Sequence, residues 1–182
     1  RVNELRFKRL LRKMENHVIL CGYGRVGQEI SNQIKTQNIP IIVVESDEDR
    51  KKIAEENGLE VLCADATLDE TLKLAGLEKC KSLVVTLPND AANLYVVLSA
   101  KGIRSSIRVI ARAGTEEAAS KLRLAGASIV VSPYIAAGRA MASMALRPIA
   151  IDFLDLLAGS ECEIEEFELS NDISLFETAE KR

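Results

Sequence analysis

Six short apolar runs recur along the chain, and a stretch with helical periodicity separates each run from the next. The runs cover residues 17–21, 41–45, 60–64, 82–86, 108–112 and 128–132, and the helical stretches cover residues 25–36, 47–57, 68–75, 90–101 and 115–125. Near-continuous apolar strands joined by helices form parallel sheets with both faces covered. The order of these elements predicts an α/β fold, a Rossmann-like doubly wound parallel sheet of six strands.

A glycine-rich loop joins the first run to the first helical stretch. Its first glycine permits a tight turn, its second has no side chain to obstruct a pyrophosphate, and its third lets the helix pack close to the strand. The N–H groups and the dipole at the helix start favour a phosphate. The loop therefore predicts a nucleotide site, with a strand–helix turn that binds no ligand as the alternative. Its residues are Gly22, Tyr23, Gly24, Arg25, Val26 and Gly27.

An acidic residue closes the second run. Glu45 stands about 20 residues after the glycine loop, where a carboxylate can accept hydrogen bonds from the ribose hydroxyls. Its charge repels a 2′-phosphate, so the sequence favours NAD or an adenine nucleotide over NADP. The next residue, Ser46, is part of the same predicted site. The alternative for Glu45 alone is an ordinary acid at a helix start, a role that Ser46 or Asp47 fills equally well.

Two more loops reach the same edge of the predicted sheet, because the carboxyl ends of parallel strands lie together. The loop after the third run can offer a carboxylate or backbone groups to an adenine, although its polar residues can equally cap the next helix. The loop after the fourth run lies across the point where the strand order reverses, the usual place for ligands; its Asp90 can equally be a helix cap. The predicted site residues here are Asp65, Ala66, Thr67, Thr86 and Leu87.

Composition and missing motifs favour a binding module over an enzyme. The chain has 24 basic and 27 acidic residues, a net charge of -3 that argues against nucleic acid as the main partner. Its four cysteines form no C-x-x-C pair, which indicates reduced thiols in a cytosolic setting. His17 precedes the first run, at the wrong end of the sheet for catalysis, and no catalytic arrangement is evident. The alternative is the dinucleotide-binding fragment of an NAD-dependent oxidoreductase.

The two ends of the chain differ from its centre. Residues 1–15 predict a basic helix, either one that caps a core or a connector on the cytoplasmic side of a membrane segment. The Ala- and Met-rich region 134–158 predicts a surplus helix that packs against another chain, with a helix folded back on its own sheet as the alternative. Residues 159–182 predict the start of a second small lobe. The chain begins with Arg, and we expect it to be a piece of a longer protein.

Several sequence blocks in order resemble the RCK domain family, also called KTN or TrkA-N. These are cytoplasmic regulatory domains of potassium channels and transporters. The resemblance implies that residues 16–133 form the nucleotide-binding lobe and that Arg112 joins the site. The blocks are residues 17–27, 64–67, 74–77, 111–113, 125–127 and 130–133, together with Thr86, Asp90 and Asn93.

The resemblance also implies a function. A ligand in the Rossmann cleft changes the geometry of an assembly of such domains, an octameric gating ring in channels, at the cytoplasmic face of the membrane. Region 134–158 is then the crossover helix of a homodimer, and residues 1–15 lead to the pore. The expected ligand is NAD(H), with ADP, AMP or ATP as alternatives. Tyr134 stands where some ATP-binding members place an acid near the phosphates, and its presence favours NAD, ADP or AMP over ATP. Acidic residues within 161–168 either contribute to a calcium site or form a solvated strand edge.

Overall fold

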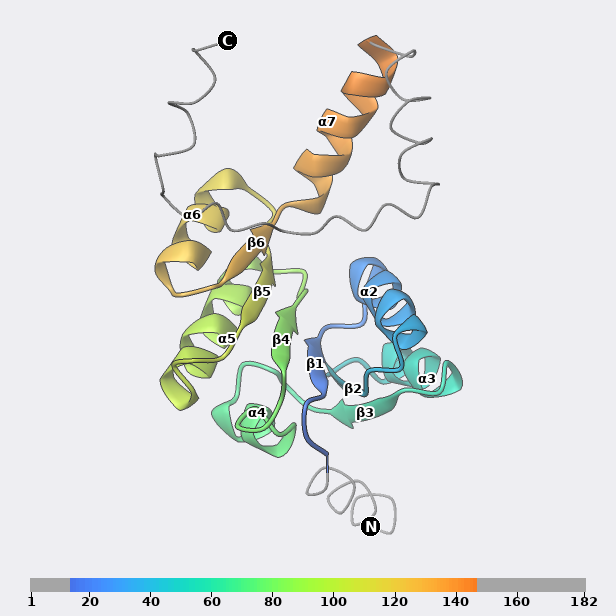
Figure 1. Ribbon diagram of the computed structural model, residues 1–182, viewed down its shortest axis with the longest axis vertical. Helices are drawn as coiled ribbons and strands as arrows, with labels where there is room; N and C mark the ends of the chain where they lie inside the picture. The colour runs from blue at the N-terminus through green and yellow to red at the C-terminus, as the bar shows by residue number, and fades with distance from the viewer. Residues whose placement is uncertain (1–13, 147–182) are drawn as a thin grey trace, which may run out of the picture. The chain divides into compact units, whose positions relative to one another are not determined.

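The strands of the chain form one parallel sheet with the order β3-β2-β1-β4-β5-β6. The structure, a computed structural model, describes residues 14–146. Figure 1 shows β1 next to β4, where the strand order reverses. This topology confirms the predicted doubly wound fold. The strands are β1 Val18–Cys21, β2 Ile41–Glu45, β3 Glu60–Cys63, β4 Ser82–Val85, β5 Val109–Arg112 and β6 Ile129–Val131.

The five helices that lie between the strands begin and end within about two residues of the predicted bounds. Three of them start with a side-chain cap that the sequence supplies. The Asp47 side chain accepts hydrogen bonds from the N–H groups of Asp49 and Arg50 and starts α3. Asn89, rather than Asp90, caps α5 in the same way. Residues 14 and 15 are not helical, and the rest of the predicted basic helix lies outside the described residues. The helices are α2 Arg25–Thr36, α3 Glu48–Glu56, α4 Asp69–Leu74, α5 Asp90–Ile103, α6 Glu116–Leu124 and α7 Pro133–Leu146.

Each face of the sheet has its own apolar core. Ile19 and Cys21 of β1 point to the face that α4, α5 and α6 cover. The alternate residues Val18 and Leu20 point to the other face, against which α2 and α3 pack (Figure 1). Because both faces are covered, both sets of side chains are buried, which explains why the strands are apolar without alternation.

Helix α7 differs from the other helices because none of its residues is buried. Met141 and Met144 are exposed. The boundary between the two units of the chain falls inside α7, after Arg139, and the structure describes only residues 140–146 of the second unit. Within the part of the chain that the structure describes, no helix has the length and apolar character needed to cross a membrane.

The buried His17 makes the stability of the fold depend on pH. Its Nε2–H donates a hydrogen bond to the Ala75 carbonyl oxygen at 2.8 Å, and its Nδ1 has no partner among the described residues. Burial lowers the pKa of His17 below 6.5, and the hydrogen bond to Ala75 only partly opposes this shift. Between the folded-state pKa and 6.5 the unfolded chain binds more protons, so the contribution of His17 to stability is complete above this window and falls as the pH drops through it.

We therefore expect acid to destabilise the wild-type protein more than the His17→Gln variant, which cannot be protonated at this position. Urea unfolding of both proteins at about pH 7 and about pH 5 measures the difference. Carboxylate contributions are common to the two proteins and cancel in the comparison. An equal loss of unfolding free energy in both would contradict the burial of a neutral imidazole.

Candidate nucleotide-binding site

The glycine loop between β1 and α2 has the geometry expected for a close approach of backbone to ligand. Gly22 has a φ of +95°, which favours glycine. A Cβ on Gly27 would lie 2.2 Å from the Gly22 carbonyl oxygen, so glycine is required for α2 to approach the strand end. A Cβ on Gly24 would meet no protein atom within 4 Å. The space beside Gly24 and the N–H groups of the first turn of α2 are therefore available to an anion.

The Glu45 carboxylate connects the loops that follow β1 and β2. Its Oε2 accepts a hydrogen bond of 2.7 Å from the Tyr23 N–H, and its Oε1 accepts one of 3.0 Å from the Asp47 N–H. Arg50 Nη1 lies 4.0 Å from Oε2. The side chain is only 5% exposed. Each carboxylate oxygen can accept a second hydrogen bond, so Glu45 can hold both loops and still accept from a ligand hydroxyl.

Buried hydrogen bonds hold the opposite side of the site, after β4 and β5. The Thr86 hydroxyl lies 3.0 Å from the Gly22 carbonyl oxygen and donates to the β1 end. The fully buried Asn93 donates to the carbonyl oxygens of Leu87 and Arg112 and accepts from the Leu87 N–H. Arg112 Nη1 also donates to the Leu87 oxygen at 2.9 Å. These contacts fix Leu87 and Arg112 opposite the glycine loop.

Most of the predicted site residues line one cleft of about 600 Å³, a volume common for ligand sites. Three arginines, Arg25, Arg50 and Arg112, line it, which favours an anionic ligand. The predicted residues in its wall are Gly22, Tyr23, Gly24, Arg25, Val26, Glu45, Ser46, Thr86, Leu87 and Arg112. Residues that the sequence analysis did not place there also line it: Gln28, Asp47, Arg50, Ile53, Pro88 and Tyr134.

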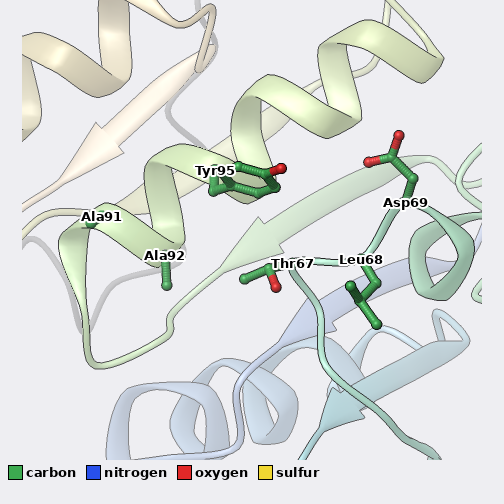
Figure 2. A pocket seen from close by; sticks show the side chains of 6 residues that line it. All are labelled: Thr67, Leu68, Asp69, Ala91, Ala92 and Tyr95. Carbon is green, nitrogen blue, oxygen red and sulfur yellow. The ribbon is translucent and has the colours of Figure 1, made fainter.

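Four predicted site residues lie outside this cleft. Gly27 and Ala66 do not line it, and Asp65 accepts two hydrogen bonds from Thr67, through its N–H and its hydroxyl. Thr67 lines a separate pocket of about 510 Å³. Figure 2 shows Tyr95 of α5 and the loop before α4 on opposite sides of this pocket, which is lined by Thr67, Leu68, Asp69, Ala91, Ala92 and Tyr95.

Asp65 and Thr67 are not the caps of α4, because the N-cap residue is Leu68 and its side chain makes no capping hydrogen bond. The hydrogen bonds between Asp65 and Thr67 instead close a local turn. Asp90 has a different role as well, since its Oδ1 accepts from the Gly114 N–H at 2.8 Å and connects the loops after β4 and β5. The three polar residues thus shape the edge of the sheet.

Two of these six further residues, Arg50 and Tyr134, show where the predicted list of site residues was incomplete. Arg50 lies in the first turn of α3 beside Glu45, and Tyr134 lies in the first turn of α7 after β6. The sequence does carry a signal that could have found them. All six parallel strands end at one edge of the sheet, so the first residues after β6 are candidates for the site, as are those after β1, β2 and β4.

The described residues hold no metal-ligating cluster, and two of their three cysteines are buried. Within residues 14–146 no group of three or more His, Cys, Asp or Glu side chains can hold a metal ion, and the acidic residues within 161–168 lie outside that range. Cys21, Cys63 and Cys80 are free thiols. Burial raises the pKa of Cys21 and raises that of Cys80 to about 11, so both stay protonated at neutral pH.

Solved structures of similar proteins share this fold. The TrkA-N domain of the inner membrane protein YbaL from Escherichia coli matches with a TM-score of 0.68 and 31% identity, over 72% of this chain and 98% of that chain. A structure of GsuK bound to ADP matches with a TM-score of 0.64 and 27% identity, over 76% of this chain and 38% of that chain.

Sequence comparison points to the same family. Potassium channel protein 1 of Methanocaldococcus jannaschii is 38% identical over 157 residues, which are 85% of this chain and 47% of that protein. The chain spans about half the length of this relative and of the probable potassium channel protein 2 from the same organism. The model of the TrkA-N domain matches residues 18–133. The chain therefore belongs to the TrkA-N domain family, which the sequence blocks resembled.

Proposed function

We propose that this chain is the nucleotide-sensing regulatory domain of a potassium channel. The relative from M. jannaschii is named as a potassium channel protein, and the similar GsuK structure is bound to ADP. The observation that carries the proposal is the combination of the buried Glu45 carboxylate with the open space beside Gly24 in one cleft. Those two features are what the ribose and the pyrophosphate of a nucleotide require.

In the proposed complex the pyrophosphate lies at the start of α2, beside Gly24 and Arg25. The ribose hydroxyls donate to Glu45, and Leu87 and Arg112 contact the ligand from the opposite side. NAD(H) is the proposed ligand, with ADP, AMP and ATP as competitors for the same site. Asp65, Ala66 and Thr67 remain proposed contacts of the base, at the edge of the sheet that holds the pocket of Figure 2.

The proposed output is a change in the geometry of paired domains. Helix α7 is the proposed contact between two copies, since it exposes Met141, Met144 and Leu146. In a channel such pairs form an octameric ring at the cytoplasmic face of the membrane, and residues 1–15 lead to the pore. Light scattering tests the pairing: we expect a dimer or larger, and a monomer at high micromolar concentration overturns it.

The Glu45→Ala variant tests the ligand class. We expect the wild-type protein to bind NAD more tightly than NADP, because Glu45 repels the 2′-phosphate. The variant loses a charged acceptor and should bind NAD more weakly by roughly 1.5–3 kcal/mol, about ten- to 150-fold. Its preference for NAD over NADP should also shrink. Calorimetric titration with both dinucleotides, and with ADP and AMP, measures these affinities.

The ratio of the two affinities is the internal control of this experiment. Loss of Glu45 also loosens the loops at Tyr23 and Asp47, but that loosening weakens both dinucleotides together. A Glu48→Ala variant removes an exposed acid from the start of α3, the helix that follows Glu45, and should keep the wild-type ratio. An unchanged ratio in Glu45→Ala would show that the ribose is misplaced. Hydride transfer by this chain to a common substrate would instead favour the oxidoreductase.

A further inference from the structure

Tyr134 stands between two arginines of the cleft. Arg25 Nη2 donates a long hydrogen bond of 3.4 Å to the Tyr134 hydroxyl. The Arg112 guanidinium carbon lies 5.4 Å from the centre of the Tyr134 ring, a distance typical of a cation–π contact. Tyr134 is 57% exposed and is the second residue of α7. One side chain thus contacts cations from both sides of the site and belongs to the helix that leaves it.

Both contacts of Tyr134 are weak compared with what a phosphate offers a guanidinium. A hydrogen bond of 3.4 Å is near the limit of useful length, and a partly exposed cation–π contact contributes little. A phosphate forms charge-assisted hydrogen bonds with arginine, often two at once. The Arg112 guanidinium lines the cleft, and its buried Nε has no hydrogen-bond partner among the described residues. A phosphate in the cleft therefore offers the two arginines a stronger partner than Tyr134 does.

The start of α7 depends on this side chain for part of its anchorage. The Ala136 N–H donates to the Ser132 carbonyl oxygen and closes the first turn of the helix. Arg139 reaches Glu116 of α6 at 3.5 Å, but both of these side chains are largely exposed, so the pair holds weakly. The contacts of Tyr134, by contrast, are made with two arginines that line the cleft, Arg25 and Arg112.

We propose that Tyr134 is a positioning residue that transmits phosphate occupancy of the cleft to helix α7. A nucleotide's phosphates draw Arg25 and Arg112 from the Tyr134 hydroxyl and ring, and the first turn of α7 is released from the wall of the cleft. The inference rests on the proposed function, since it requires a phosphate-bearing ligand. It adds a residue and a direction to the coupling: the phosphate, rather than the base, controls the helix.

The chain has no tryptophan, so a Tyr134→Trp variant carries a single fluorescent reporter that still offers a ring to Arg112. The matched control is Leu124→Trp, at a residue that is 88% exposed and ends α6 just before β6 begins, at the edge of the sheet opposite the cleft. We expect ADP to change the emission of Tyr134→Trp until it saturates. The ADP concentration at half-maximal change should equal the one found for the same variant by thermal-shift titration. Adenosine, which has no phosphate, should leave that emission unchanged, and ADP should leave Leu124→Trp unchanged.

Affinities provide a second readout that a merely structural role would not move. Tyr134→Leu removes both contacts with the arginines, so it should bind ADP about two- to fivefold more tightly than the wild type, the equivalent of one exposed cation–π contact. Its affinity for adenosine should stay the same. Tyr134→Phe keeps the ring over Arg112, so its affinity for ADP should lie between those of the wild type and of Tyr134→Leu.

The outcomes separate this inference from the proposed function. If ADP stabilises the wild-type protein but the Tyr134→Trp emission does not respond, the inference is wrong and the nucleotide site stands. Weaker binding of ADP to Tyr134→Leu also overturns it, because Tyr134 then acts as an ordinary ligand contact. If none of NAD, ADP, AMP and ATP stabilises the wild-type protein, the proposed function fails and the inference fails with it.

Discussion

Replacing Gly27 with alanine should destabilise the protein by about 3 kcal/mol and abolish nucleotide binding. The added Cβ would lie 2.2 Å from the Gly22 carbonyl oxygen, a backbone atom that cannot move aside like a flexible side chain. Helix α2 must therefore move away from the end of β1, and the N–H groups of its first turn move with it. Urea unfolding measures the stability change, and calorimetric titration with ADP measures the binding.

Two other glycines are matched controls for this substitution. Gly24→Ala places its Cβ where no protein atom lies within 4 Å, so the fold should keep its stability while the methyl group obstructs the phosphate. Gly102→Ala also meets open space, inside α5, and should raise stability by about 0.5–1 kcal/mol through helix propensity. If Gly27→Ala unfolded at the wild-type urea concentration, the close approach of α2 to β1 would be disproved.

Replacing Asn93 with alanine should destabilise the protein by about 2–4 kcal/mol, because it removes a fully buried side chain together with its hydrogen bonds to the backbone. The Asn93 side chain has no exposed surface and makes three hydrogen bonds with the backbone of Leu87 and Arg112. The variant should also bind ADP more weakly, since both residues line the cleft. Unfolding and titration on the same sample measure the two effects.

Asn89 provides the matched control in the neighbouring turn. Its exposed side chain caps α5 by accepting from Ala91 and Ala92, and Asn89→Ala should cost about 1 kcal/mol, the usual value of a cap. Asn89 does not line the cleft, so ADP affinity should remain at the wild-type level. Equal losses of stability in the two variants would show that the hydrogen bonds of the buried Asn93 stabilise the fold no more than those of an exposed helix cap.

The sequence alone was enough to predict the fold and the part of the site that the glycine loop and Glu45 form. Six apolar runs separated by helical patterns admit few arrangements other than a doubly wound sheet, because each strand must be covered on both faces. The six strands and the five helices between them fall within about two residues of their predicted bounds, and caps such as Asp47 are local signals for where a helix starts. The glycine loop and Glu45 are also local signals, each at a fixed spacing from a strand end.

The tertiary structure decided how these parts are connected. Glu45 accepts from Tyr23, 22 residues away, and Arg25 donates to Tyr134, 109 residues away. It also separated Thr67 from the cleft and gave Asp90 a bond to Gly114 in place of a cap. Such contacts depend on which strand ends become neighbours in the folded sheet. Periodicity along the chain determines whether a residue lies in a strand or a helix, whereas the partners of a side chain depend on the spatial order of the strands in the sheet.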